Sequence, residues 1–377
     1  MSDPFEFADD LGPAKTVHIV EPALGLRAVL VIDNVAIGPS IGGIRMAPDV
    51  TAEEAFRLAR AMTFKNSAAG LPHGGGKAVI IADPHMPLAR KEQWIRAFAR
   101  AIADLKDYIP GPDMGTDERA MAWIFDEIGR VVGLPREIGG IPLDEIGATG
   151  WGVFHAVDVA FEHLGAELAG ARVVIQGFGA VGMHAARFLG QRGAVLVAAA
   201  DSRGTLADAK GLDVEALIAL KHEGKSVVDA PFGDRLGLEA ALDQESDIWI
   251  PAARPDVVHA GNVGRLRTRV VAQGANIPFT EEAERTLHEQ GVLVLPDFIA
   301  NAGGVICAAV EYHGGSESTA MQTIEEKVRA NTKAVLELSR RDGILPRRAA
   351  LTLARQRVRR AMELRRFGSR SAAPAER

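Results

Sequence analysis

The chain has 377 residues, and its 43 lysines and arginines against 49 aspartates and glutamates give a net charge of −6. Hydrophobic residues make up 47% and charged residues 24%, which excludes a disordered chain. At about 150 residues per domain, the length predicts two domains. The mild acidity argues against a nucleic-acid partner, and no apolar run reaches the ~20 residues of a membrane-spanning helix, so we expect no membrane partner.

The cysteine and glycine counts set two further expectations. Cysteine occurs once, so no intramolecular disulfide can form, and the acidic first ten residues carry no signal-peptide pattern. We therefore expect a cytoplasmic protein in a reducing compartment. Glycine occurs 40 times, and glycine collects where the backbone turns tightly or approaches a ligand closely.

The first part of the chain mixes short strands and helices. In chain order we expect hairpin strands at 16–20 and 28–32, a helix from Thr51 to about Ser67, a buried strand at 77–81, a helix over about 90–106 and another from near Thr116. The hairpin prediction rests on two apolar runs separated by turn residues. The first helix opens on the capping-box pattern Thr51-Ala-Glu-Glu54.

From Ala148 onward, helical stretches alternate with short continuous apolar runs. The runs lie at 172–176, 195–200, 247–250, 269–272 and 292–295. Such alternation predicts parallel strands with crossover helices, which is a doubly wound sheet. We therefore predict an α/β fold with an N-terminal α/β domain over 1–147, a Rossmann-type domain over 148–314, and C-terminal helices of about 315–377 that return to the first domain.

A glycine motif in the second domain predicts a dinucleotide site. Gly177-Phe-Gly179-Ala180-Val181-Gly182 follows an apolar strand and opens a helix, the context in which this pattern binds pyrophosphate. The next strand ends in Asp201, an acid that can bind the ribose hydroxyls and repel a 2′-phosphate. We therefore favour NAD as cofactor, although Arg203 leaves NADP open. The alternative is a glycine-rich turn with a capping aspartate.

Two lysines and an aspartate in the first domain suggest a catalytic centre. Leu58, Met62 and Lys65 follow one face of the predicted helix, and a lysine on an apolar face needs a partner or loses its charge. Lys77 follows three glycines, which suggests that Gly75 and Gly76 leave the backbone bare for a small ligand. Asp113 lies on a glycine-rich turn before a helix. Snorkelling of Lys65 and helix capping by Asp113 are the structural alternatives.

Seven ordered motifs, spread over about residues 28–365, resemble the glutamate/leucine/phenylalanine/valine dehydrogenases. They are Gly42-Gly-Ile-Arg45, Met62-Thr-Phe-Lys-Asn66, Gly74-Gly-Gly-Lys77-Ala, Gly111-Pro-Asp113, Gly177-Phe-Gly-Ala-Val-Gly182, Gly274-Ala-Asn276 and Asn301-Ala-Gly-Gly304. The resemblance implies reversible NAD(P)-dependent oxidative deamination of an L-amino acid to a 2-oxo acid and ammonia. It also implies a first domain that binds substrate and supports a homo-oligomer.

The resemblance assigns roles motif by motif. Lys65 is similar to the family lysine that pairs with the substrate α-carboxylate, Lys77 to the catalytic lysine and Asp113 to the catalytic acid/base. Thr149, Asn276 and Asn301 resemble positions near the nicotinamide and the reacting carbon. A lysine that is partly desolvated and close to another cation has a lowered pKa, which suits activation of water.

Departures from the glutamate pattern predict the substrate class. Glutamate dehydrogenases of the family carry a lysine at the position of Ile41 and a serine at that of Ala308, so two contacts to a γ-carboxylate are missing here. A buried carboxylate without partners is costly, and we expect an apolar amino acid of the leucine, valine or phenylalanine type. Gly111 and Ala308 are both small where leucine enzymes of the family tend to carry larger residues, so we expect a pocket widened toward phenylalanine or another aromatic side chain.

Three alternatives remain open from the sequence. The stretches Asp201-Ser-Arg-Gly204 and Pro296-Asp-Phe-Ile-Ala300 are more similar to glutamate enzymes, which keeps glutamate as a possible substrate. A catalytically silent NAD-binding regulator on the same fold is a second alternative. Another Rossmann enzyme, such as a hydroxy-acid dehydrogenase, would need a catalytic His or Arg that has no comparable setting here. The histidines show no metal-binding motif, so we expect no metal.

Overall fold

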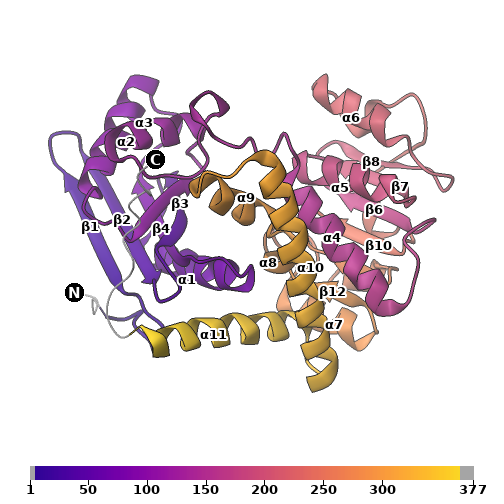
Figure 1. Cartoon of the computed structure of the whole chain (residues 1–377). Helices are drawn as coiled ribbons and strands as arrows, with labels where there is room; N and C mark the ends of the chain where they lie inside the picture. Colours follow the sequence, from indigo (N-terminus) through magenta and orange to yellow (C-terminus); the bar gives the residue numbers. More distant parts are fainter. Residues whose placement is uncertain (1–4, 366–377) are drawn as a thin grey trace. The chain divides into compact units, whose positions relative to one another are not determined.

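The computed structural model describes residues 5–365, which divide into two compact units (Figure 1). The first unit comprises residues 5–142, 305–320 and 351–365, and the second residues 143–304 and 321–350. The C-terminal helices expected over 315–377 therefore divide between the units, and residues 366–377 lie outside the described part. Residues 321–350 group with the second unit because α10 (Glu317–Asp342) bonds to α4 (Ala148–Leu164) there: Arg329 donates to Asp158 at 2.5 Å.

The first unit is built on a five-stranded sheet in the order β1-β2-β4-β3-β5. Its strands are β1 (Lys15–Glu21), β2 (Leu26–Asn34), β3 (Ser40–Ala47), β4 (Gly74–Ile81) and β5 (Tyr108–Pro112). The hairpin prediction is confirmed, since β1 pairs with β2 in antiparallel register. β3 runs parallel to both β4 and β5. The sequence did not predict β3 and β5, because their glycines and prolines are untypical of strands.

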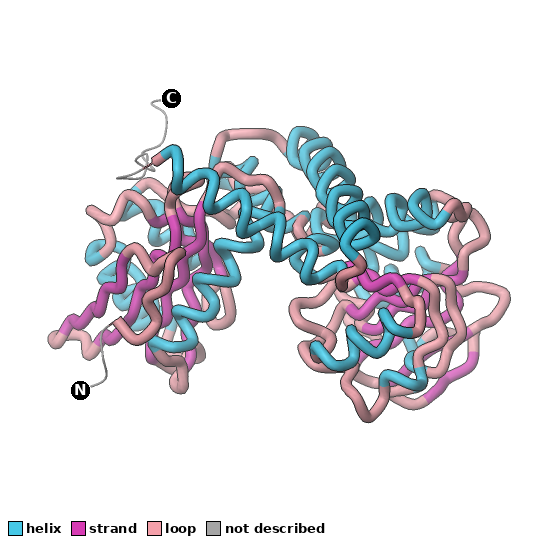
Figure 2. Tube along the Cα trace, turned by 90° about the horizontal axis from the view of Figure 1, so that it is seen from below, coloured by secondary structure: helices cyan, strands magenta, loops and turns pink. Residues whose placement is uncertain are grey.

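Helices cover both faces of this sheet (Figure 1). α1 (Ala52–Ala68) packs its alanines on valines of β2 and β4, whereas α2 (Leu88–Ala101) and α3 (Glu118–Ile128) cover the opposite face. Figure 2 shows the strands of this unit, in magenta, between helices in cyan. The predicted cap is present, since the Thr51 hydroxyl accepts a hydrogen bond from the Glu54 amide at 3.1 Å.

The last helix, α11 (Pro346–Leu364), packs its C-terminal half against α1 within the first unit. The Ser67 hydroxyl donates to the carbonyl oxygen of Ala354 at 2.9 Å. The Arg357 guanidinium donates to the carbonyl oxygens of Ser67 and Ala68 at 2.8 and 2.7 Å. Both carbonyls belong to the last turn of α1, where the Ser67 carbonyl also accepts a hydrogen bond from the Gly70 amide at 3.0 Å, so α11 adds donors to the end of the helix that carries Lys65.

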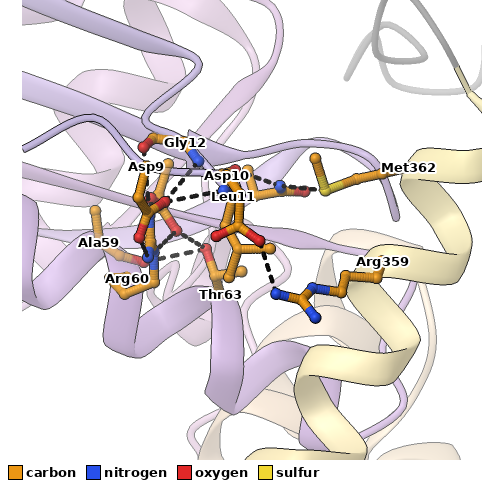
Figure 3. A network of polar contacts seen from close by, with 11 residues as sticks. Asp9, Asp10, Leu11, Gly12, Ala59, Arg60, Thr63, Arg359 and Met362 are labelled. Carbon is orange, nitrogen blue, oxygen red and sulfur yellow. Dashed lines mark hydrogen bonds and ion pairs between the residues drawn. The ribbon is translucent and has the colours of Figure 1, made fainter. Parts of the chain in front are cut away.

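A network of charges ties the N-terminal segment to α1 and α11 (Figure 3). Arg60 of α1 bridges two aspartates, Asp9 at 2.6 Å and the fully buried Asp33 at 2.9 Å. The Thr63 hydroxyl donates to Asp33 at 2.6 Å, and Arg359 of α11 donates to Asp10 at 2.7 Å. Burial raises the pKa of Asp33, while its bonds to Arg60 and Thr63 act in the opposite direction.

The second unit carries a seven-stranded sheet in the order β12-β11-β10-β6-β7-β8-β9. Five strands are parallel: β6 (Arg172–Gln176), β7 (Val195–Asp201), β10 (Ile248–Pro251), β11 (Val270–Ala272) and β12 (Leu293–Leu295). The predicted doubly wound α/β sheet is thus confirmed. Two antiparallel strands, β8 (Gly204–Ala207) and β9 (Asp234–Leu236), extend one edge and were not predicted.

The remaining helices of this unit place the candidate cofactor residues. They are α5 (Ala180–Gln191), α6 (Val214–His222), α7 (Glu281–Glu289) and the short α8 (Asp297–Ala300). α9 (Gly303–Tyr312) follows α8 and belongs mostly to the first unit. The chain order reverses between β6 and β10, where β7 lies on the other side of β6. Doubly wound sheets bind ligands at such a switch point.

Candidate active site

The side chains of Lys77 and Asp113 form an ion pair in the first unit. Lys77 lies within β4, and Asp113 directly follows β5. Gly43 on β3, between these strands, makes the contact possible: a Cβ built there would lie 2.8 Å from Asp113 Cβ and 3.3 Å from Lys77 Nζ. Any other residue at position 43 would therefore crowd the pair.

Burial and charge shift both groups of this pair. Only 6% of Lys77 is exposed, and burial lowers the pKa of its ammonium, helped by the nearby Arg45 cation and opposed by Asp113. Burial alone would raise the pKa of Asp113, but Lys77 and Arg45 outweigh it and lower that pKa below its ordinary value. The pair thus combines a lysine whose charged form burial disfavours with a carboxylate whose charged form its cationic neighbours favour.

Arg45 is a third member of this centre that sequence reasoning missed. Its Nε donates to Asp113 at 3.3 Å, and its guanidinium donates to Glu54 of α1 at 2.6 Å. Glu54 therefore binds Arg45, although the capping-box pattern suggested a contact with the start of its own helix. A signal was present, since Gly43 and Arg45 are two apart on one strand and face the same side.

Lys65 occupies the last turn of α1 and is half-buried. The apolar stripe that the sequence suggested, with Leu58 and Met62, is wrong, since both are only half-buried. The buried face is instead made of small and polar residues: Ala55, Ala59, Thr63, Asn66, Ser67 and Ala68. α1 lies so close to the sheet that large side chains do not fit beneath it.

Gly75 and Gly76 do not leave an open space for a ligand, so that interpretation is corrected. Both are buried in β4. A Cβ at Gly75 would lie 2.0 Å from the backbone nitrogen of Thr63, and one at Gly76 would lie 2.9 Å from Ser40 Oγ. Their small size lets α1 and the neighbouring strand approach, which fixes the position of Lys77 next in the chain.

The residues proposed to determine specificity lie on β3, β5 and α9. Ile41 is 4% exposed on β3, and Ala308 is half-buried on α9. Gly111 leaves no empty space, because a Cβ built there would lie 2.9 Å from Val132 Cγ2. The expected widening at Gly111 is therefore corrected: the buried Val132, which sequence reasoning missed, fills it.

The glycine motif of the second unit forms the turn between β6 and α5. Gly177 has φ +104°, in the left-handed region, and a Cβ at Gly182 would lie 2.1 Å from the carbonyl oxygen of Gly177. A Cβ at Gly179 would meet nothing within 4 Å. Ala180 and Val181 begin α5, so backbone N–H groups of a helix N-terminus follow the open Gly179, which suits a pyrophosphate.

A cavity of about 560 Å³ adjoins this turn, with Gly177, Gly179, Asp201 and Lys221 in its wall. The Asp201 carboxylate accepts four hydrogen bonds, from Arg203 N, Ser226 Oγ, Lys221 Nζ and Val227 N, at 2.7–3.0 Å. Burial would raise its pKa, but these donors lower it. The Arg203 guanidinium bonds to Asp229 at 2.6 Å.

In the second unit, Asn276 and Asn301 are in contact, and Thr149 lies beside the first turn of α9. Asn301 Nδ2 donates to Asn276 Oδ1 at 2.9 Å, and a Cβ at Gly304 would lie 3.1 Å from Thr149 Oγ1. Asn301 Oδ1 is buried and has no hydrogen-bond partner among the described residues. A buried acceptor without a partner fits a site that receives a donor group, such as a carboxamide or an amine.

The described residues contain no group of three or more His, Cys, Asp or Glu side chains that could hold a metal ion. Within residues 5–365, no helix combines the length and the apolar character needed to cross a membrane. Cys307 is buried, and burial raises the pKa of its thiol to about 12.

Two family models match most of the chain. The model described as Glutamate/Leucine/Phenylalanine/Valine dehydrogenase matches residues 139–366, and the Glu/Leu/Phe/Val dehydrogenase dimerisation domain matches residues 16–130. A glutamate dehydrogenase from Aeropyrum pernix is 38% identical over 356 residues, which is 88% of this chain and 85% of the relative.

Solved structures give the same result. The hetero-hexameric glutamate dehydrogenase from Thermus thermophilus in its Leu-bound form has a TM-score of 0.81 at 30% identity, covering 95% of this chain and 91% of that one. The L-tryptophan dehydrogenase from Nostoc punctiforme has a TM-score of 0.75 at 25% identity, covering 93% and 97%. The chain belongs to the glutamate/leucine/phenylalanine/valine dehydrogenase family and is an amino acid dehydrogenase that acts on CH–NH₂ donors.

Proposed function

We propose that the protein catalyses the reversible oxidative deamination of an apolar L-amino acid to its 2-oxo acid and ammonia, with NAD or NADP. The observation that carries the substrate class is the apolar pair Ile41 and Ala308, which stands where glutamate enzymes of the family carry lysine and serine. A γ-carboxylate would meet neither partner, and a buried carboxylate without partners is strongly unfavourable.

The nicotinamide, when bound, accepts the hydride from the substrate Cα, and the chain's own residues handle the remaining chemistry. Lys65 holds the α-carboxylate. Lys77, whose pKa burial lowers, takes a proton from the water that attacks the iminium carbon. Asp113 takes a proton from the substrate ammonium before hydride transfer and returns it to the same nitrogen, which then leaves as ammonia. Its ion pair with Lys77 keeps both groups on one face of the sheet.

The side-chain pocket is proposed to be lined by Ile41, Val132 and Ala308. Val132 fills the position above Gly111, and Gly111 pairs directly with Gly43, the residue beside Lys77 and Asp113. An apolar wall next to the reacting centre favours leucine, valine or phenylalanine. A single methylene in such a pocket changes specificity by about 10- to 200-fold, so we expect graded rather than absolute preferences.

The residues around the cofactor cavity suit NADP as well as NAD. Members of the family use NAD or NADP. The four donors on Asp201 occupy the acceptor positions that a ribose 2′-hydroxyl would need. Lys221 neutralises that carboxylate and faces the same cavity, so the repulsion of a 2′-phosphate is weakened. We infer that the protein uses NADP in addition to NAD.

Glutamate oxidation is the second candidate, because the relative from Aeropyrum pernix is named a glutamate dehydrogenase. It requires a positive partner for the γ-carboxylate, which Ile41 and Ala308 do not supply. A silent regulator is a third candidate from another class. The ion pair of Lys77 with Asp113 argues against it.

The first unit is also proposed to support a homo-oligomer. β1 lies at the edge of its sheet, and most of its residues are exposed. An open strand edge is ready to pair with another chain, and one of the matched models is described as a dimerisation domain. Light scattering after size exclusion measures the assembly mass, and a monomer would contradict the proposed homo-oligomer.

The single cysteine remains our reason to propose that the protein is cytoplasmic.

A kinetic panel tests the proposed function. Purified protein is assayed for NADH and NADPH formation with leucine, valine, phenylalanine, alanine and glutamate, each with NAD and with NADP. We expect turnover with the apolar amino acids and with both cofactors. Preference for glutamate would contradict the substrate class, and no turnover with any amino acid would favour the silent regulator.

A further inference from the structure

The carboxylate of Glu311 is a buried group for which the reaction has no direct use. Glu311 lies in the last turn of α9 and is 7% exposed. It accepts three backbone hydrogen bonds: Oε1 from Gly133 N at 2.7 Å and Leu134 N at 3.1 Å, and Oε2 from Ile141 N at 2.8 Å. All of these residues belong to the first unit.

The segment that Glu311 holds is the one that carries Val132. Gly133 directly follows Val132, and the Val132 amide donates to the carbonyl oxygen of Pro110 at 2.9 Å. Gly133 has φ +78°, and a Cβ there would lie 2.6 Å from Pro112 Cδ. The segment therefore lies directly on the end of β5, one residue before Asp113.

The helix that Glu311 belongs to carries Ala308. The two residues are three apart on α9, so they share one face of the helix. Glu311 thus joins two pieces of chain that are far apart in sequence. One presents Val132 above Gly111, and the other presents Ala308.

We propose that Glu311 is a positioning residue that sets the distance between the Val132 and Ala308 walls of the side-chain pocket, and so determines which apolar amino acids the enzyme accepts. The inference rests on the proposed function. Its chemical basis is that a carboxylate only accepts hydrogen bonds and can satisfy three N–H donors at once. A glutamine keeps the shape but turns an NH₂ group toward one or more of those donors.

The test compares Glu311→Gln with a matched control. Glu317→Gln removes another carboxylate of the C-terminal region that bonds to the same loop, since Glu317 contacts Arg136 at 3.1 Å, but this pair is exposed. For each variant, kcat and KM are measured with alanine, valine, leucine and phenylalanine, and folding is checked by circular dichroism and thermal unfolding. Binding of leucine and phenylalanine is also measured by calorimetry, which is independent of turnover.

We expect Glu311→Gln to change the ratio of kcat/KM between the smallest and largest substrates by about tenfold, the scale of a small change in pocket volume. The change should lie mainly in KM, with the KM for the cofactor unaltered, and Glu317→Gln should match the wild type. Val132→Ala should shift the same ratio, and the double variant should be non-additive, because both changes act on one wall.

Several outcomes overturn the inference. A folded Glu311→Gln enzyme whose kcat/KM ratios match those of the wild type overturns it. An equal loss of kcat with every substrate also overturns it. Additivity of Glu311→Gln with Val132→Ala would show that Glu311 does not act through the Val132 wall. If Glu311→Gln does not fold, the calorimetric selectivity of Val132→Ala decides, and an unchanged value overturns the inference. A wild type that oxidises no amino acid is distinguishable from all of these, since it overturns the proposed function and the inference with it.

Discussion

Glycine serves opposite purposes in the two units. In β4 of the first unit, glycine is required because the protein itself fills the space beside the backbone: a Cβ at Gly75 would lie 2.0 Å from Thr63 N. In the β6–α5 turn of the second unit, a Cβ at Gly179 would meet nothing within 4 Å. One glycine run brings backbones together to fix a lysine, and the other leaves space for a ligand. A glycine-rich motif alone does not distinguish these cases.

The largest effect is expected from Gly75→Ala. The added methyl group would overlap backbone atoms of α1, which cannot move without displacing the helix. We expect a loss of about 3 kcal/mol or more in the free energy of unfolding, with little soluble enzyme. Urea unfolding measures it, and a variant of wild-type stability would show that the space beside Gly75 is open after all.

Lys77→Ala should remove catalysis and leave the second unit intact. A general base contributes about 10²- to 10⁴-fold to a rate, so kcat should fall by that range, whereas cofactor binding measured by fluorescence titration should stay within about twofold. A variant that keeps most of its activity would exclude Lys77 as the catalytic lysine.

The pH profile of the wild type provides a second test of Lys77. Its pKa is lowered from the ordinary 10.5 because burial disfavours the ammonium, and in the proposed mechanism the neutral amine takes the proton from water. The kcat/KM for deamination should therefore rise with pH and level off below pH 10.5. A rise that continues beyond that value would contradict the lowered pKa.

Removing an arginine that pairs with a buried aspartate in the first unit should cost more free energy of unfolding than removing one that pairs with exposed carboxylates in the second unit. Arg60→Ala leaves the fully buried Asp33 with one fewer partner, and removing a partner from a buried charge costs about 3–5 kcal/mol. Arg265 in the second unit pairs with the exposed Glu239 and Asp243, and Arg265→Ala should cost less than about 1 kcal/mol. Equal losses in urea unfolding would contradict this ranking.

The smallest effect on stability is expected from Gly179→Ala. Because the methyl group has free space, the free energy of unfolding should change by less than about 1 kcal/mol. The same methyl group would meet the pyrophosphate, so the KM for the cofactor should rise by about tenfold or more, with the affinity for the amino acid retained. An unchanged cofactor KM would place the dinucleotide elsewhere.

Much of the fold was predictable because the second unit follows regular patterns. Its parallel strands read as continuous apolar runs, and its glycine motif has the expected strand–turn–helix context. The first unit was harder, since β3 and β5 contain glycines and prolines that weaken the strand pattern.

The candidate site was predictable only as far as motifs reach. Lys77 and Asp113 were found from motifs, and they are in contact. Val132, Lys221 and Glu311 were missed because each acts on a residue distant in the sequence, so local spacing carries no signal for them. What fills the space beside Gly75 or Gly111 likewise depends on packing between distant segments.

The central claim is that this dehydrogenase acts on apolar amino acids, and the ratio of kcat/KM for L-leucine to that for L-glutamate tests it most directly. With Ile41 and Ala308 in the proposed pocket, a γ-carboxylate lacks partners, and we predict a ratio of about 100 or more. A ratio of one or less would contradict the claim.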